Sequence, residues 1–316
     1  MNTRYLLVLA ACAVLCACAC NKEPDTPDVP DDPQPVSNTW PEAGMKDATY
    51  ISNGEVQIGV DLNRGGAIFH FSESGTKRNL LNHYDEGRFV QQSYYGDSDG
   101  SNWNGTPWNW NPVQGGSWQG QKAEVIYKEI TEDKIIVHTT PRHWATGESL
   151  TNCVMKEEIT LQGKYAKVHY TFEYSGSASY KKRHQEMPAV FCDYALGNLV
   201  YYSGSKAWTG AAVTKKVPGN LSEGATNQYV TRTEEWSAYV DANDWGIGVY
   251  TPGTKEITYY TFGSGSGGAR ASACSYFAPI RTLAITSGLK LNYDVYITIG
   301  TVDEIRSRFD GIRKGL

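Results

Sequence analysis

The chain has 316 residues, with 29 Lys and Arg against 34 Asp and Glu, and 12% of its residues are aromatic. Residues 1–32 contain five acidic and two basic residues, so this stretch carries −3 of the net charge of −5 and the rest of the chain carries −2. The near-neutral body excludes the basic footprint of a nucleic-acid-binding protein. The aromatic content excludes a disordered chain, and no apolar run past residue 20 approaches the ~20 residues of a membrane span, which excludes a polytopic membrane protein.

The first 20 residues have the pattern of an export signal. Arg4 precedes the apolar run LLVLAACAVLCACAC, which has the length of a signal-peptide core. Leu15-Cys16-Ala17-Cys18 resembles the bacterial lipobox, which predicts lipidation at Cys18, with Cys20 as the alternative. We therefore expect residues 1–20 to be a lipoprotein signal peptide. The mature protein would be exported to the outer membrane, on its cell-surface or periplasmic face, and held there by its lipid alone. The competing interpretation is an ordinary signal peptide with incidental cysteines.

Residues 21–39 are rich in Pro and Asp, which predicts an extended, disordered linker ahead of one folded domain at 40–316. The domain holds three cysteines, Cys153, Cys192 and Cys274, without zinc-ligand spacing. At most one disulfide is available to them. Three buried free thiols are the simpler expectation, so the core must stabilise the fold.

Short segments with alternating apolar residues, separated by Gly, Asn, Asp and Ser, dominate the body and predict strands. The expected strands are 50–60 with an Asn-Gly turn inside it, 66–71, 134–139, 154–161, 166–174, 245–250, 256–262 and 290–299. Helical periodicity occurs at 302–313, and no fixed-period repeat is present. The pattern predicts an all-β fold, a single large antiparallel β-sandwich with a short C-terminal helix. Long Gly/Asn/Ser-rich stretches at 73–122 and 203–233 are expected to be functional loops.

Residues 91–121 interleave tryptophans with Asn, Gln and Gly. A sugar ring has an apolar face and a rim of hydroxyls, so a sugar site needs aromatic platforms beside amide hydrogen-bonding groups. We therefore expect an oligosaccharide or polysaccharide as the partner. We also expect the protein to be a monomer. The competing interpretation is that the tryptophans only pack the loop onto the sandwich. The candidate substrate-binding residues are Gln91, Gln92, Tyr94, Trp103, Trp108, Trp110, Gln114, Trp118, His143, Trp144, Arg183 and Trp236.

Five further residues are candidates for catalysis. His184 and Glu186 are two positions apart, so on a strand they share a face. In a hydrolase, Glu186 and Asp85 would divide the acid and base roles. In a lyase, His184 or Tyr95 would take a proton from a uronic acid whose carboxylate Arg88 neutralises. The competing interpretation for His184 and Glu186 is a hydrogen-bonded pair on a solvent-facing strand.

We expect no cofactor and no catalytic metal, because the chain lacks the nucleotide-binding, nucleophile-elbow and zinc-protease motifs. Residues 97–102 have a weak similarity to a calcium loop. The glycine there has the wrong offset, and no Glu closes the loop at its twelfth position. A structural calcium site is therefore only a minor alternative.

Several segments resemble a family of secreted glycan-processing proteins of Bacteroidetes, and the resemblance covers most of residues 50–310. These segments are NLLNHYDEGRFVQQSYYG, WNPVQGGSW, RHQEMPAVF, EEWSAYVDANDWGIGVYTPG and IGTVDEIRSRF. The stretch GGAIFHFSESGTKRNLLN also resembles the early strands of aldose epimerases, although the chain has no Asn-His-x-x-Phe-Asn motif. The resemblance implies a galactose-mutarotase-like supersandwich.

The leading hypothesis is thus a lipoprotein that binds and cleaves a glycan, by glycoside hydrolase or polysaccharide lyase chemistry. The first alternative is a non-catalytic surface glycan-binding protein of a polysaccharide-utilisation system, which needs only the tryptophans and amides. The second is a scaffold whose aromatic residues all lie in the core.

The lipidation hypothesis is open to direct test by mass spectrometry of the mature protein purified from membranes. We expect an N-terminal peptide that begins at Cys18, or at Cys20, and carries acyl chains, because the lipobox cysteine is the acylated residue. A mature protein with a free, unlipidated N-terminus would contradict the hypothesis.

Overall fold

A computed structural model describes Met45 and residues 47–315. The predicted signal peptide, the lipidation at Cys18 or Cys20 and the predicted linker lie outside the described residues. All the segments discussed below therefore belong to the predicted β domain.

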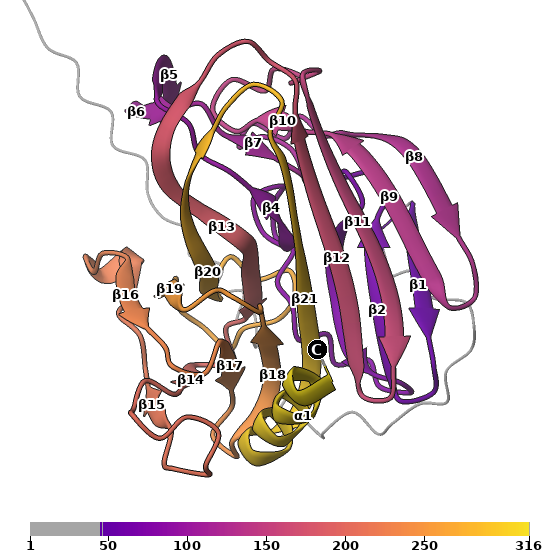
Figure 1. Cartoon of the computed structure of the whole chain (residues 1–316), viewed down its shortest axis with the longest axis vertical. Helices are drawn as coiled ribbons and strands as arrows, with labels where there is room; N and C mark the ends of the chain where they lie inside the picture. The colour runs from indigo at the N-terminus through magenta and orange to yellow at the C-terminus, as the bar shows by residue number, and fades with distance from the viewer. Residues whose placement is uncertain (1–44, 46, 316) are drawn as a thin grey trace, which may run out of the picture. The chain divides into compact units, whose positions relative to one another are not determined.

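The first of two large antiparallel sheets has ten strands within the described part of the chain (Figure 1). Eight of them follow the order β1-β2-β3-β4-β13-β20-β19-β16, while β7 pairs with β4 and β10 pairs with β7. Their bounds are β1 (Ala48–Ser52), β2 (Val56–Asp61), β3 (Ala67–Glu73), β4 (Val90–Ser93), β7 (Pro112–Val113), β10 (Arg142–His143), β13 (Tyr180–Asp193), β16 (Gln228–Thr231), β19 (Glu256–Phe262) and β20 (Cys274–Ile285).

The second large sheet has nine strands in the order β15-β14-β17-β18-β21-β12-β11-β9-β8. A separate hairpin is formed by β5 (Ser98–Trp103) and β6 (Thr106–Asn109). The bounds in the nine-stranded sheet are β8 (Glu124–Ile130), β9 (Lys134–Thr140), β11 (Cys153–Gln162), β12 (Tyr165–Tyr174), β14 (Asn198–Tyr201), β15 (Thr214–Lys216), β17 (Trp236–Val240), β18 (Trp245–Tyr250) and β21 (Lys290–Thr301).

The all-β prediction is confirmed, and so are the expected strands. The Asn53-Gly54 turn connects β1 to β2, where Gly54 adopts a φ of +86° that glycine tolerates without steric cost. The two stretches expected to be loops contain secondary structure, which corrects that expectation. Residues 73–122 contain β4 to β7, and residues 203–233 contain β15, β16 and the short helix η1 (Leu221–Glu223). These strands are two to six residues long, too short for alternation to reveal them in the sequence.

The main core lies between the two large sheets, because one side chain in two from each strand points inward. Ile58 and Val190 from the ten-stranded sheet, and Phe172, Val249 and Ile297 from the nine-stranded sheet, have no exposed surface and belong to one apolar cluster. Cysteines Cys153, Cys192 and Cys274 are buried and free, as expected.

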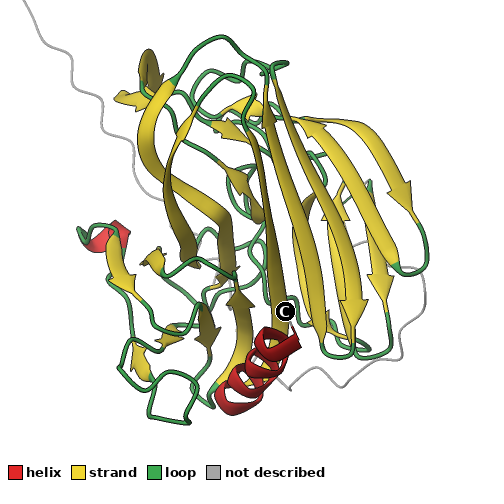
Figure 2. Ribbon diagram, viewed as in Figure 1, coloured by secondary structure: helices red, strands yellow, loops and turns green. Residues whose placement is uncertain are grey.

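The expected C-terminal helix is α1 (Val302–Gly315), shown red in Figure 2 together with η1. Its start is a capping box, in which Thr301 N–H donates to Glu304 Oε2 at 2.8 Å and Glu304 N–H donates to Thr301 Oγ1 at 3.4 Å. Ile305 and Phe309 bury its apolar face in a second cluster with Trp236. No helix in the described ranges is long and apolar enough to cross a membrane.

One carboxyl group is buried inside the structure without a cation. Glu157 on β11 accepts a hydrogen bond from Gln114 Nε2 at 3.0 Å, and its Oε1 has no hydrogen-bond partner among the described residues. Burial raises the pKa of Glu157 to about 8, since the charged form loses its water. Glu157 is therefore largely protonated at neutral pH.

This burial makes stability depend on pH. Folded Glu157 keeps its proton up to about pH 8, whereas in the unfolded chain Glu157 releases it above its ordinary pKa near 4.5. The stability that this buried proton contributes is therefore complete below pH 4.5 and is lost as the pH rises toward about 8. We expect the free energy of unfolding to fall by up to about 1.4 kcal/mol per pH unit in this window, and Glu157→Gln to flatten the dependence. Urea unfolding at a series of pH values measures both.

The matched control is Glu158→Gln, which alters the exposed neighbour on the same strand and should leave the pH dependence unchanged. An equally steep loss of stability in Glu157→Gln would show that the buried proton contributes nothing.

Candidate functional site

A pocket with a cavity volume of about 240 Å³ lies on the face of the ten-stranded sheet that points away from the core. Tyr259 and Phe277 point into the core, so their neighbours Tyr260 and Tyr276 point to the opposite face, into the pocket. The pocket is lined by Gly87, Ser93, Tyr95, Trp103, Trp108, Asn111, Val113, Trp144, Glu186, Phe191, Leu221, Asn227, Tyr260 and Tyr276.

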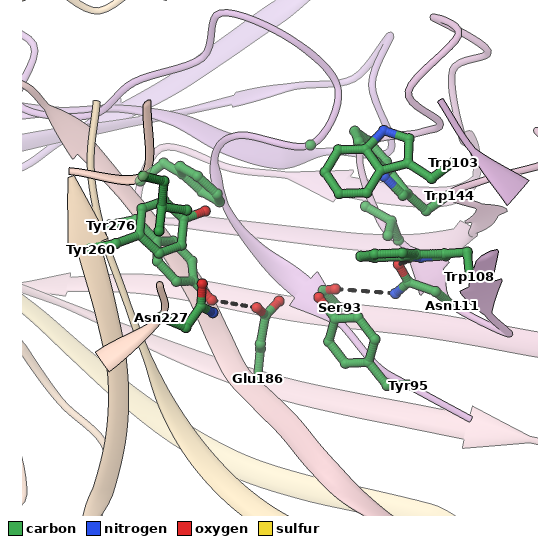
Figure 3. A pocket seen from close by; sticks show the side chains of 14 residues that line it. Ser93, Tyr95, Trp103, Trp108, Asn111, Trp144, Glu186, Asn227, Tyr260 and Tyr276 are labelled. Atoms are coloured by element: carbon green, nitrogen blue, oxygen red, sulfur yellow. Dashed lines mark hydrogen bonds between the residues drawn. The ribbon is translucent and has the colours of Figure 1, made fainter. Parts of the chain in front are cut away.

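Three tryptophans form one wall of the pocket (Figure 3). Trp103 and Trp108 come from the β5–β6 hairpin, and Trp144 directly follows β10. Their rings pack edge to face, with the Trp103 centroid 4.7 Å from that of Trp108 and 5.9 Å from that of Trp144. Asn111 orients the wall, because its Oδ1 accepts from Trp108 Nε1 at 3.2 Å while its Nδ2 donates to the backbone oxygen of Tyr94 at 2.7 Å.

Tyrosines from β19 and β20 form the facing wall. Tyr260 and Tyr276 stack with their ring centroids 4.4 Å apart, and Phe191 on β13 lies 4.6 Å from Tyr276. Figure 3 shows Asn227 beside the two tyrosines, with Glu186, Ser93 and Tyr95 between the two walls. The pocket therefore has aromatic surfaces on both sides and polar groups between them.

Glu186 is the acidic residue in this lining. Burial raises its pKa, while side-chain hydrogen bonds from Tyr276, Ser93 and Tyr95 oppose the rise by stabilising the ionised form. Tyr276 donates directly to Glu186 Oε1. Burial also raises the pKa of Tyr95 and of Tyr276 well above that of a free tyrosine, so both hydroxyls keep their protons. The site thus holds a carboxyl group with a raised pKa against neutral hydroxyl donors.

Five of the residues expected from sequence meet in this pocket: Tyr95, Trp103, Trp108, Trp144 and Glu186. Sequence reasoning missed the others, above all Tyr260, Tyr276 and Asn227. The first two are aromatic residues on the outward face of strands, but nothing along the chain indicates that β20 lies beside β13 and β19 beside β20. Asn227 comes from a stretch whose short elements were not predicted.

The other candidate catalytic residues lie outside the lining. His184 is exposed, with its ring 5.4 Å from that of Tyr229. Arg88 places its Nε 3.5 Å from Asp85 Oδ2 and donates from Nη1 to the backbone oxygen of Ser272 at 2.5 Å. Arg88 and Asp85, the cation and the second carboxylate expected in the site, are therefore paired with each other, and Arg88 also bonds to the backbone.

Three predicted glutamines are buried and hold the backbone, which corrects their assignment to substrate. Gln91 accepts from Gly115 N–H at 2.7 Å, and Gln92 donates to the backbone oxygen of Lys156 at 3.0 Å. Gln114 donates to Glu157 and to the backbone oxygen of Gly65. Amide side chains suit this role because each donates and accepts.

Three predicted aromatic residues are also packing residues, and their burial corrects the expected contact with sugar. Tyr94 has no exposed surface and lies in the main core, where Trp110 stacks on Tyr180 with centroids 4.3 Å apart. Trp236 is buried beneath α1 and donates from Nε1 to Glu234 Oε2 at 2.7 Å. Their aromatic character alone could not separate core from site.

The remaining predicted residues support the neighbouring loops. Trp118 donates from Nε1 to the backbone oxygen of Ala145 at 2.9 Å. Arg183 donates from Nη2 to Asp97 Oδ1 at 2.8 Å. His143 is buried; its Nδ1 accepts backbone N–H groups, so Nε2 carries the proton shared with Asp99 Oδ2 at 2.8 Å.

The weak calcium-loop similarity has a different explanation in the structure. Asp97 pairs with Arg183, and Asp99 accepts from His143 and from Ser101 N–H at 2.9 Å. Within the described part of the chain, no group of three or more His, Cys, Asp or Glu side chains could hold a metal ion.

Solved structures share this fold at very low sequence identity. An Escherichia coli K12 protein described as a candidate aldose 1-epimerase matches 81% of this chain and 100% of its own, at 10% identity and a TM-score of 0.51. A galactose mutarotase related enzyme from Lactobacillus acidophilus matches 80% of this chain and 97% of its own, at 8% identity and a TM-score of 0.49. A galactose mutarotase-like protein from Lactobacillus casei matches 80% of this chain and 99% of its own, at 11% identity and a TM-score of 0.49.

No protein-family model and no curated protein sequence matches the chain. The structural likeness shows the fold alone, since one fold hosts many activities. The expected galactose-mutarotase-like supersandwich with a C-terminal helix is thereby confirmed.

The site geometry predicts how the titration of Glu186 responds to its hydrogen bond. In Tyr276→Phe the pKa of Glu186 should rise further, because the lost hydroxyl stabilises the ionised carboxylate. Carbon-13 NMR of labelled glutamate measures the titration, with Glu186→Gln assigning the signal. Tyr260→Phe is the matched control, since Tyr260 has no hydrogen bond to Glu186. A pKa that falls or stays constant in Tyr276→Phe would contradict this account of the site.

Proposed function

We propose that this protein is a carbohydrate-active enzyme that binds a neutral sugar in the pocket and uses Glu186 as its acid–base residue. The observation that carries the proposal is the position of Glu186, a carboxyl group with a raised pKa between two aromatic walls. Catalytic acids and bases need a pKa near the operating pH, and burial of a carboxyl group is a common way to obtain it.

The lining has the chemistry that a sugar requires. Trp103, Trp108 and Trp144 face Tyr260 and Tyr276, so a pyranose between them has aromatic surface on each side. Hydroxyl and amide groups of Ser93, Tyr95, Asn111 and Asn227 offer donors and acceptors to sugar hydroxyls. The E. coli protein of the same fold is described as a candidate aldose 1-epimerase, which further supports a sugar ligand.

The charges of the lining favour a neutral sugar. Among the described residues that line the pocket, Glu186 is the one carboxyl group, and none is Lys or Arg. A uronic acid would bring a carboxylate next to Glu186 without a cation to neutralise it, which disfavours lyase chemistry. We therefore propose hydrolysis of a glycosidic bond in which Glu186 protonates the departing glycosidic oxygen. A water molecule attacks the anomeric carbon, forms the new C–O bond and releases its proton to solvent.

A non-catalytic glycan-binding function is the second candidate. One observation favours it: two-carboxylate hydrolysis needs a second acid, and Asp85 lies outside the lining, paired with Arg88. A binder would keep its whole function when Glu186 loses its charge.

As for location, we propose an exported outer-membrane lipoprotein. The Leu15-Cys16-Ala17-Cys18 sequence supports this, and the mass measurement of the mature N-terminus tests it.

Glu186→Gln separates the two functions. We expect the release of reducing ends from a panel of plant, algal and host glycans to fall at least about 100-fold in this variant, because the amide cannot transfer a proton. Sugar affinity, measured by calorimetry, should change only a few-fold. The same panel should show no absorbance of unsaturated uronates.

Asp85→Asn is the matched control, since it neutralises a nearby carboxylate outside the lining and should keep most of the activity. Equal loss in both variants would place Asp85 in the mechanism. Wild-type rates in Glu186→Gln would remove Glu186 from it, and sugar binding without turnover in the wild type would establish the binding function.

A further inference from the structure

Exposed aromatic side chains gather around the pocket. Eight large hydrophobic side chains are exposed among the described residues, and one of them, Trp103, lines the pocket. Tyr229 and Phe262 each follow a lining residue by two positions, and Tyr84 lies with Phe262 against Arg88. Of the others, three are on β8 and one is Val217. Soluble proteins rarely expose such groups together without a binding role.

At one end of the pocket, Phe262 continues the tyrosine wall. It follows Tyr260 by two residues on β19, so it shares that face, and it is 37% exposed. The guanidinium of Arg88 lies 5.5 Å from the Phe262 ring and 5.0 Å from the ring of Tyr84, which is 52% exposed. The hydrogen bond from Arg88 to the backbone of Ser272 holds this arrangement in place. The result is an ordered aromatic platform directly beside the pocket.

At the other end lies Tyr229, which is 49% exposed. It follows Asn227 of the lining by two residues and pairs opposite Thr258 of β19. Its ring is 5.4 Å from that of His184, which precedes Glu186 by two residues on the same face of β13.

The order of residues along β19 places these two platforms on opposite sides of the pocket. Tyr229 is level with Thr258, Tyr260 of the wall comes next on this face, and Phe262 follows. Four residues of strand span about 13 Å at roughly 3.3 Å per residue, which is longer than one sugar ring. The cavity, at about 240 Å³, is smaller than the ~300–1,000 Å³ of common ligand pockets. It suits one ring, with aromatic platforms for further rings on both sides.

We infer that the substrate is an extended neutral glycan chain that passes through the pocket along the direction of β19. One ring lies over Glu186, and the neighbouring rings stack on Tyr229 and on Phe262. This inference rests on the proposed function and adds the substrate class to it. A monosaccharide would reach neither platform, and its binding would not depend on them.

The test uses the Glu186→Gln variant, which prevents turnover, and calorimetry with gluco-, xylo-, manno- and galacto-oligosaccharides from monosaccharide to hexasaccharide. Affinity should rise with chain length within the series that binds. Adding Tyr229→Ala or Phe262→Ala should lower the affinity for the longest oligosaccharide about tenfold, and leave the affinity for the monosaccharide unchanged. Tyr127→Ala is the matched control, because this tyrosine on β8 is 46% exposed and lies outside the lining.

The outcomes separate this inference from the proposed function. If the monosaccharide binds as tightly as the hexasaccharide, or if both platform variants bind the hexasaccharide like the control, the extended-chain inference is overturned while sugar binding stands. If no member of any series binds, the proposed function itself fails. Circular dichroism of each variant confirms that the measured protein is folded.

Discussion

The site depends on the pairing of β13 with β4 on one side and β20 on the other. One face of these strands must fill the core, so alternate residues are directed to the opposite face. The pairing sets Ile280 opposite Glu186 and Tyr276 opposite Phe191, and Tyr276 then reaches the Glu186 carboxyl group. The same constraint that buries the apolar half of each strand therefore surrounds one carboxyl group with aromatic rings and raises its pKa.

Carboxyl groups that are fully or partly shielded from water have two kinds of partner among the described residues. Glu234 has no exposed surface and is paired with Arg306 at 2.5 Å, beneath α1. Glu157 and Glu186 have neutral partners, an amide in one case and hydroxyls in the other, and both have a raised pKa. A cation favours the ionised form, whereas neutral donors only partly compensate for lost water. The ion pair attaches the helix, and the neutral surroundings leave the pKa of Glu186 raised.

Most of the fold could be predicted from the sequence, and less of the site. Long strands such as β11 and β12 alternate over ten residues, and helical periodicity marks α1, so local pattern was sufficient there. For the site, Trp108 and Trp110 differ by two positions in one segment. The first lines the pocket and the second stacks inside the core. Residue type alone does not distinguish a tryptophan that lines the pocket from one that packs in the core.

Alternation and composition, which are local properties, were enough to establish a large antiparallel β fold, its terminal helix, an aromatic and amide-rich region and the candidate Glu186. The tertiary structure decided which of those residues meet. It paired Arg88 with Asp85 outside the pocket, buried Gln91, Gln92 and Gln114, and brought Tyr260, Tyr276 and Asn227 to Glu186. Strand pairing joins segments far apart along the chain, and no local pattern encodes which strands become neighbours.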